Sequence, residues 1–347
     1  MMAYNPIDCL CEGRLIRDME MIACKDLEYS YPVFNKEPGF LNGLKDFFHR
    51  EISYVRAIDG VNCQIGQGEL IGLLGENGAG KTTLMKLLSG ILTPQGGEVS
   101  VLGYAPQRRE HAFLQDIGVM FGQKTQLIWD LPAIDTFHSL KVIYGIEEAA
   151  FKKDLDFLLE KLSLKDKLFV PVRKLSLGQI VKFNLIATVI HRPKLLMLDE
   201  PTIGVDILSQ SNIHDFLLSY NQIYGATILL SSHNTKDIRA VAKRILFLDK
   251  GQVLYDGPLS QFRFSDNPQH SYVLRTKTDS LPAGFDASRM RCEKIDTASY
   301  RISVQTPGDL SCLDFSDITS IQEEESDLDE TLKAFYRAQN QARGQDS

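Results

Sequence analysis

Short apolar runs alternate with helical patterns through the middle of this 347-residue chain. Each run is made mostly of Leu, Ile and other apolar residues, which is typical of strands buried inside a parallel sheet. The runs are residues 70–74, 195–198, 227–230 and 245–248. Between them, one helical face is marked by Phe151, Leu155, Leu159 and Leu162. Strands that alternate with helices predict an α/β fold, a parallel sheet covered by helices on both faces.

The N-terminal part reads as strands with one interruption. Residues 1–20 are expected to form an extension, and a strand is expected over Met21–Tyr31. Prolines and glycines break the pattern over residues 32–53, and strands resume at Tyr54. Within the break, the apolar and basic segment Phe40–Arg50 either touches a membrane or partner or packs as a surface loop, and the residues leave both interpretations open.

The chain changes character after about residue 256. Large or apolar residues alternate with polar ones over Tyr300–Val304, which predicts a strand. The acidic run Glu323–Glu330 is expected to begin a solvated helix that carries Leu332 and Phe335, because carboxylates stabilise helix N-termini.

Composition narrows the classes of function. A formal net charge of −7 argues against a nucleic-acid partner, which usually requires a basic face. No apolar stretch approaches the roughly 18 residues of a membrane-spanning helix. The six cysteines lack metal-site spacing, so we expect reduced thiols in a cytosolic protein.

One segment carries a specific chemical motif. Residues 75–82 fit the phosphate-binding pattern Gly-x4-Gly-Lys-[Ser/Thr] without a mismatch. A predicted strand precedes the segment. A helical pattern follows it, formed by Leu84, Leu87, Leu88 and Ile91 with Gly90 as a stop signal. In this arrangement, backbone N–H groups and the positive end of the helix converge on a polyphosphate. The loop consists of Gly75, Glu76, Asn77, Gly78, Ala79, Gly80, Lys81 and Thr82.

Four polar side chains suggest the chemistry of this loop. Lys81 would reach the β- and γ-phosphates of a nucleotide, and the Thr82 hydroxyl would ligand Mg²⁺. Asp199 and Glu200 end the apolar run 195–198, where one carboxylate can hold Mg²⁺ through water and the other can activate the attacking water. An apolar run that ends in Asp-Glu is a weak signal alone, and its weight comes from the motifs around it.

With these motifs in this order, residues 21–260 resemble the ATP-binding subunits of ABC transporters. The signature of that family is usually Leu-Ser-Gly-Gly-Gln, and this chain has Leu175-Ser176-Leu177-Gly178-Gln179. The resemblance implies a P-loop NTPase (ABC ATPase) fold. Its parts would be a RecA-like parallel sheet core, an antiparallel β subdomain, a helical subdomain near residues 124–190 and a small C-terminal α+β extension. The expected domains are residues 21–258, which bind nucleotide, and an accessory domain over residues 259–347.

The resemblance also assigns roles to further residues. Gln123 looks like the family's sensing glutamine and a Mg²⁺ ligand, and His233 looks like its switch histidine. Asp199 would serve Mg²⁺ and Glu200 would activate water. Tyr31 sits where the family places an aromatic that stacks on adenine, with Tyr54 as the competitor, and Thr83 extends the loop's contacts with ATP.

The family works as a head-to-tail dimer that encloses ATP, with Mg²⁺ as cofactor. Residues of one subunit would therefore complete the site of the other, either a second copy or a paralogue. These residues are Ser176, Leu177, Gly178, Gln179 and Asp206. Three positions depart from the family pattern without touching catalytic atoms: Leu177, Ile180 and Asn234. We therefore expect a competent ATPase.

The resemblance implies a transport motor that docks on integral membrane permease subunits at the cytoplasmic face of the membrane. The segment Phe121–Pro132 is similar to bacterial ABC-2-type (daunorubicin-resistance-like) export ATPases, which favours an exporter. The alternative is a soluble ABC ATPase that acts in iron–sulfur assembly, translation or repair. The residues after position 256 would either stabilise a dimer or sense a ligand. The transported substrate stays open.

Overall fold

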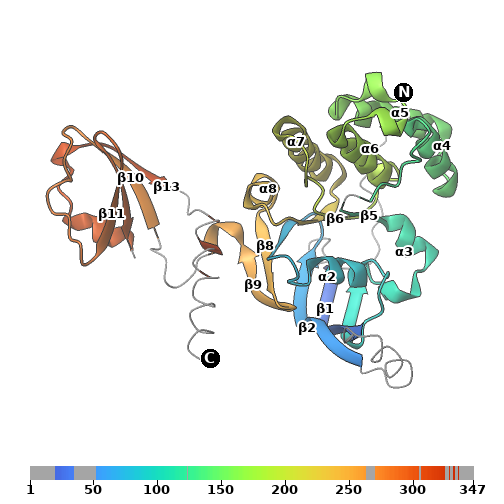
Figure 1. Ribbon diagram of the computed structural model, residues 1–347, viewed down its shortest axis with the longest axis horizontal. Helices are drawn as coiled ribbons and strands as arrows, with labels where there is room; N and C mark the ends of the chain where they lie inside the picture. The colour runs from blue at the N-terminus through green and yellow to red at the C-terminus, as the bar shows by residue number, and fades with distance from the viewer. Residues whose placement is uncertain are drawn as a thin grey trace, which may run out of the picture. The chain divides into compact units, whose positions relative to one another are not determined.

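The computed structural model describes residues 20–34, 52–122, 124–262, 270–304 and 306–324, together with Leu328, Thr331, Leu332 and Phe335. The chain divides into two compact units, residues 1–259 and 260–347 (Figure 1). Residues 1–19 of the expected N-terminal extension, the segment Phe40–Arg50 and Gln123 lie outside the described residues, whereas Glu20 already belongs to a strand.

A six-stranded sheet forms the centre of the first unit, with the strand order β5-β6-β7-β3-β8-β9. The strands are β3 (Leu70–Leu74), β5 (Ile117–Phe121), β6 (Leu195–Asp199), β7 (Thr227–Ser231), β8 (Arg244–Asp249) and β9 (Gln252–Pro258). The first five are parallel, and β9 pairs with β8 in the antiparallel sense. The four apolar runs predicted as strands are confirmed as β3, β6, β7 and β8.

The helices of the first unit bury apolar faces against this sheet or against one another (Figure 1). They are α2 (Lys81–Leu88), α3 (His111–Asp116), α4 (Ala133–Ile143), α5 (Glu148–Lys161), α6 (Leu177–Val189), α7 (Ile207–Tyr224) and α8 (Thr235–Val241). The predicted apolar stripe of α5 is confirmed, since Phe151, Leu155, Leu159 and Leu162 are all buried.

The helix after the glycine loop is shorter than the sequence pattern predicts. It ends at Leu88, and Ile91 is exposed. The chain turns away at Gly90, which has a φ of 73°. A Cβ at Gly90 would lie 2.0 Å from the carbonyl oxygen of Pro106, so only glycine allows this close approach.

A second, three-stranded antiparallel sheet has the order β2-β1-β4. Its strands are β1 (Glu20–Phe34), β2 (Ile52–Gly66) and β4 (Gly96–Val101). Both β1 and β2 run further than predicted, because the strands continue to pair through Pro32↔Tyr54 to Phe34↔Ile52. One face packs into the same core as α2 and the central sheet.

The second unit contains a four-stranded antiparallel sheet, with the order β11-β12-β10-β13, and its own apolar core. Its strands are β10 (His270–Thr276), β11 (Met290–Asp296), β12 (Ser299–Val304) and β13 (Ile318–Glu324). The predicted strand Tyr300–Val304 is confirmed within β12. The predicted helix does not begin at Glu323, because Glu323 and Glu324 pair with β10 as the end of β13. Its later part is confirmed, since Leu328, Thr331, Leu332 and Phe335 are helical. None of the helices in the described ranges combines the length and the hydropathy of a membrane-spanning helix.

The packing of α6 makes a stability prediction. Phe183 is fully buried, and its ring centroid lies 6.1 Å from that of Phe137 on α4. Replacing it with alanine leaves a cavity, so we expect Phe183→Ala to lower the free energy of unfolding by about 3–5 kcal/mol in urea denaturation.

Phe169 provides the matched control, because its side chain is 73% exposed. We expect Phe169→Ala to change the free energy of unfolding by less than about 0.5 kcal/mol. Equal losses in the two variants would show that α4 and α6 do not pack as described.

Candidate functional site

The glycine loop follows directly from the carboxyl end of β3 and leads into α2. Two of its glycines are required by close backbone packing. A Cβ at Gly75 would lie 2.3 Å from the Leu248 carbonyl oxygen, and one at Gly80 would lie 2.5 Å from the Ala57 carbonyl oxygen. Gly78 differs, because a Cβ there would meet nothing within 4 Å. The loop is thus anchored at its ends, and its middle leaves open space for a ligand.

Lys81 is held inside the loop. Its side chain is buried, and its Nζ donates to the carbonyl oxygens of Gly75 at 2.5 Å and Glu76 at 3.0 Å. Burial lowers the pKa of Lys81, while the nearby carboxylates of Glu200, Asp199 and Glu76 act in the opposite direction. The ammonium therefore sits where phosphate oxygens would replace carbonyl partners.

Asp199 joins three elements at the edge of the sheet. Its Oδ2 accepts a hydrogen bond from Thr82 Oγ1 at 2.7 Å, and its Oδ1 accepts one from Ser231 Oγ at 2.5 Å. Hydroxyl and carboxylate oxygens are the hard ligands that Mg²⁺ prefers. The pair Thr82 and Asp199 therefore fits Mg²⁺, with Thr82 on the loop and Asp199 on β6.

Glu200 and His233 contact each other at the same edge. His233 Nδ1 lies 2.7 Å from Glu200 Oε2. Glu200 has a φ of 52°, an uncommon conformation for a residue with a side chain, and its backbone N–H donates to Ser231 O at 3.1 Å. The strand end is thus turned so that a carboxylate and an imidazole from neighbouring loops meet.

A buried carboxylate lies beneath this pair. Asp237, near the start of α8, accepts hydrogen bonds from Thr202 Oγ1 at 2.6 Å and Ser232 Oγ at 3.0 Å, and His214 Nε2 lies 3.0 Å away. Burial alone would raise the pKa of Asp237, but hydrogen bonds from His214, Thr202 and Ser232 outweigh it and hold that pKa below its ordinary value. Asp237 is therefore a charged group inside the protein.

Tyr31 approaches the loop from β1. Its hydroxyl lies 3.4 Å from Thr83 Oγ1, and its ring meets Tyr29 edge-on with centroids 4.9 Å apart. The competing aromatic, Tyr54, is 67% exposed. The contact with Thr83 keeps Tyr31 as the candidate that stacks on the base.

The segment Ser176–Gln179 forms the start of α6. Ser176 Oγ accepts from Gln179 N at 3.3 Å, and Gln179 Oε1 accepts from Ser176 N at 3.0 Å, which closes a capping box. Gly178 faces the start of α7, since a Cβ there would lie 3.1 Å from Asp206 Oδ2. Within the described part of the chain, no hydrogen bond joins Ser176–Gln179 to the glycine loop.

Sequence reasoning missed the residues that support this site. The sequence motifs single out His233 but none of the supporting residues, which are Ser231, Ser232, His214 and Asp237. Asp237 gave one usable signal, because an acid in the first turn of a helix that follows the switch loop can reach back to that loop. Nothing local marks His214, because its partner is 23 residues away in the sequence.

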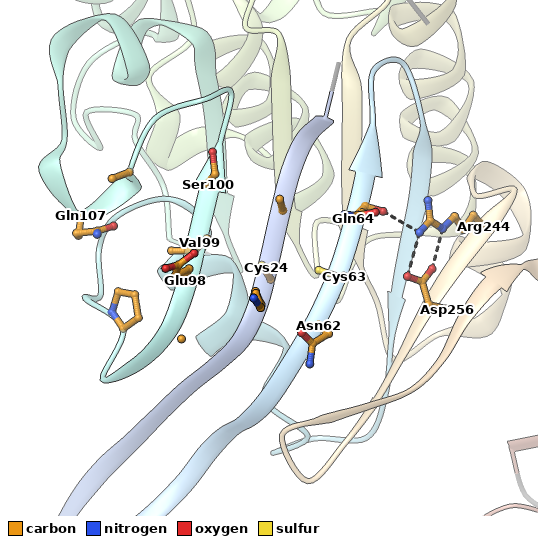
Figure 2. A pocket seen from close by; sticks show the side chains of 15 residues that line it. Cys24, Asn62, Cys63, Gln64, Glu98, Val99, Ser100, Gln107, Arg244 and Asp256 are labelled. Atoms are coloured by element: carbon orange, nitrogen blue, oxygen red, sulfur yellow. Dashed lines mark hydrogen bonds and ion pairs between the residues drawn. The ribbon is translucent and has the colours of Figure 1, made fainter. Parts of the chain in front are cut away.

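A hollow in the first unit lies elsewhere, on the sheet β2-β1-β4 (Figure 2). It measures about 870 Å³, and none of its lining residues belongs to the glycine loop. Arg244 at its rim donates to Asp256 at 2.7 Å and to Glu69 at 2.8 Å. This guanidinium is therefore already committed to partners within the protein.

Comparisons with known proteins agree with this geometry. The sequence profile of the family described as "ABC transporter" matches residues 58–203. ABC transporter ATP-binding protein NatA of Bacillus subtilis (strain 168) is 29% identical over 231 residues, which cover 66% of this chain and 94% of NatA. The uncharacterized ABC transporter ATP-binding protein YybJ of the same strain is 30% identical over 204 residues, which cover 59% of this chain and 91% of YybJ.

A third relative is named for import. The methionine import ATP-binding protein MetN 2 of Bacillus thuringiensis subsp. konkukian (strain 97-27) is 29% identical over 240 residues, which cover 68% of this chain and 69% of MetN 2.

Two solved structures share the fold. MJ0796, described as a dimeric bacterial ABC transporter cassette, matches with a TM-score of 0.58 and 22% identity over 69% of this chain and 99% of that chain. The protein cbiO1 from Clostridium perfringens, described as part of the ABC transporter complex cbiONQ, matches with a TM-score of 0.57 and 24% identity over 70% of this chain and 89% of that chain.

The contact between Glu200 and His233 leads to a test of the water-activating base. We expect Glu200→Gln to bind ATP with nearly unchanged affinity, because the loop and Lys81 are intact. Its kcat should fall about 10²- to 10⁴-fold, because the amide cannot accept the proton. Phosphate release measures kcat, and a fluorescent ATP analogue measures affinity. Glu98→Gln, on the exposed edge of β4, is the matched control and should keep the wild-type rate. Wild-type turnover in Glu200→Gln would remove Glu200 from its assigned role.

Proposed function

Because the chain belongs to the family of ABC transporter ATP-binding proteins, and is thus an ATP-hydrolysing transporter subunit, we propose that it drives an exporter of the ABC-2 type. In this proposal it docks on separate permease subunits at the cytoplasmic face of a membrane. The observation that carries the docking role is the exposure of three apolar side chains, Ile128, Trp129 and Leu131, just after the sensing-glutamine position.

Hydrolysis in this proposal uses the residues gathered at the edge of the sheet. The glycine loop and Lys81 hold the phosphates, while Mg²⁺, when held by Thr82 and Asp199, neutralises charge on them. Glu200 accepts a proton from the attacking water, whose oxygen bonds to the γ-phosphorus as the bond to ADP breaks. His233 holds Glu200 and contacts the γ-phosphate.

A second subunit completes the site. Gly178 of the Ser176–Gln179 segment lies close to the start of α7, and among the described residues no hydrogen bond joins the segment to the glycine loop. Next to it, Ile207 and Leu208 are 82% and 78% exposed at the start of α7. Large apolar side chains gathered beside a phosphate-binding motif favour burial against a partner. A second copy of this chain fits, as in the dimeric cassette MJ0796.

The permease surface is formed by Ile128, Trp129 and Leu131, which are 45%, 54% and 42% exposed. Backbone hydrogen bonds from Arg173 N to Trp129 O and from Val172 N to Leu131 O hold this segment alongside residues 171–173. An exposed Trp on a fixed backbone is a typical anchor at protein interfaces. The surface also lies close in sequence to Gln123, so nucleotide state can reach the permease over a short path.

The segment Phe121–Pro132, which is similar to export ATPases of the ABC-2 type, supports the proposed direction of transport. Because one relative is named for import, direction needs its own experiment. Inside-out vesicles from cells that make the whole transporter would be incubated in cell extract with ATP, and the solutes in their lumen compared by mass spectrometry. An exporter adds solutes to the lumen, with Glu200→Gln vesicles as the control. Loss of solutes from the lumen would identify an importer.

The docking surface predicts the location of the protein in cells. We expect the double change Trp129→Ser with Leu131→Ser to reduce the fraction that sediments with membranes about tenfold, because an apolar anchor is lost. Binding of ATP by the purified variant should not change. Ile223→Ser, at an equally exposed apolar position on α7, should sediment like the wild type. A wild-type protein that stays in the supernatant would instead favour a soluble ABC ATPase.

A further inference from the structure

A buried carboxylate connects the two loops that carry Glu200 and His233. Asp237 is 3% exposed, and both of its oxygens are engaged. Thr202, which donates to it, lies two residues after Glu200, and Ser232, which also donates to it, immediately precedes His233. Both hydroxyl partners are themselves buried.

The same carboxylate also organises the turns around these residues. Ser232 Oγ accepts a hydrogen bond from Asn234 N at 3.0 Å while it donates to Asp237, which fixes the chain on both sides of His233. On the other side, Gln210 Nε2 donates to the carbonyl oxygens of Thr202 and Val205, at 3.4 Å and 2.9 Å. Each loop is therefore tied to the body of the protein, and Asp237 ties one loop to the other.

His214 adds a third element to the link that Asp237 makes between the two loops. It lies on α7, which begins just after the Glu200 loop, whereas Asp237 lies on α8, just after the His233 loop. A carboxylate can only accept hydrogen bonds, so Nε2 of His214 carries the proton in this contact. Asp237 thus accepts three hydrogen bonds, two from the loops and one from helix α7.

We infer that Asp237 is a positioning residue for ATP hydrolysis, which holds Glu200 and His233 at the separation that their direct contact requires. It touches neither the glycine loop nor Lys81 through any hydrogen bond among the described residues. Its effect should therefore fall on the catalytic step and not on ATP binding. The inference rests on the roles proposed for Glu200 and His233, and it is independent of the direction of transport.

The test is a double-mutant cycle on the full chain. Asp237→Asn keeps the shape of the side chain but removes its charge and one acceptor oxygen. We expect kcat for ATP to fall about 10- to 100-fold, as is common when a supporting hydrogen-bond partner of a functional group is lost. KM should change less than about twofold, because Asp237 does not contact the residues that are proposed to bind ATP.

The cycle adds His233→Ala. If Asp237 acts by placing His233 and Glu200, then Asp237→Asn should slow the His233→Ala protein by less than about twofold, because the arrangement it maintains is already broken. The same fold-loss in both backgrounds, or a wild-type rate in Asp237→Asn alone, would overturn the inference. A wild-type rate in His233→Ala alone would instead contradict the proposed role of His233. It would also mean that Asp237 cannot act on hydrolysis by positioning His233.

Two further sets of variants separate positioning from simple loss of folding. Asp154 on α5 is 5% exposed and paired with Arg192, so Asp154→Asn removes a similarly buried carboxylate that bonds to neither loop among the described residues. It should keep kcat within about twofold of wild type, since it supports no functional group.

Thr202→Val and Ser232→Ala each remove one donor while Asp237 stays in place. Each should lower kcat with an unchanged KM, and unchanged kcat in both would count against the inference even if Asp237→Asn failed to fold.

Discussion

The buried carboxylate of Asp199 is the contact on which the rest of the site depends. It accepts hydrogen bonds from Thr82 at the start of α2 and from Ser231 at the end of β7. A buried charge is tolerated only when it is paired or hydrogen-bonded, so these two bonds fix three segments that are distant in the sequence. The strand order makes them possible, because β6, β7 and β3 are parallel neighbours whose carboxyl ends share one edge.

The features that depend on local chemistry were predictable from the sequence. The glycine loop can be recognised from its sequence pattern, because the close approach of the backbone requires glycine at positions 75 and 80. The apolar runs identify β3, β6, β7 and β8, since strands covered on both faces must be apolar throughout. What escaped prediction depends on long-range packing. The sequence signal for strand β5 is weak because Gly118 interrupts its apolar run. Glycine is required there, since a Cβ would lie 2.6 Å from Thr188 O on α6. The strand β9 escaped for another reason: it pairs only with β8, at the edge of the sheet, so its residues alternate between exposed and half-buried.

The residues that hydrogen-bond to the site residues were not predicted either, because they too depend on long-range packing. His214 and Asp237 lie on different helices, and only the packing of α7 beside α8 brings them together. Ser231 is likewise an ordinary end of an apolar strand until β6 is placed next to it. The residues proposed to act on the phosphates lie in short sequence motifs, whereas the residues that hydrogen-bond to them are brought together by the order of the strands and helices. A site of this kind can therefore be located from sequence, but its rigidity has to be explained from structure.

In the proposed dimer, one chain supplies only half of the surroundings of each nucleotide, because Ser176–Gln179 would serve the site of the neighbouring subunit. The most direct measurement mixes two inactive variants. Lys81→Ala loses the phosphate-binding ammonium, and Leu177→Asp places a carboxylate at an exposed first position of α6, where it suits the helix but repels phosphate. A dimer that contains one of each keeps one intact site, so an equal mixture should hydrolyse ATP at about a quarter of the wild-type rate. A mixture that is no faster than the two variants measured separately would contradict the account.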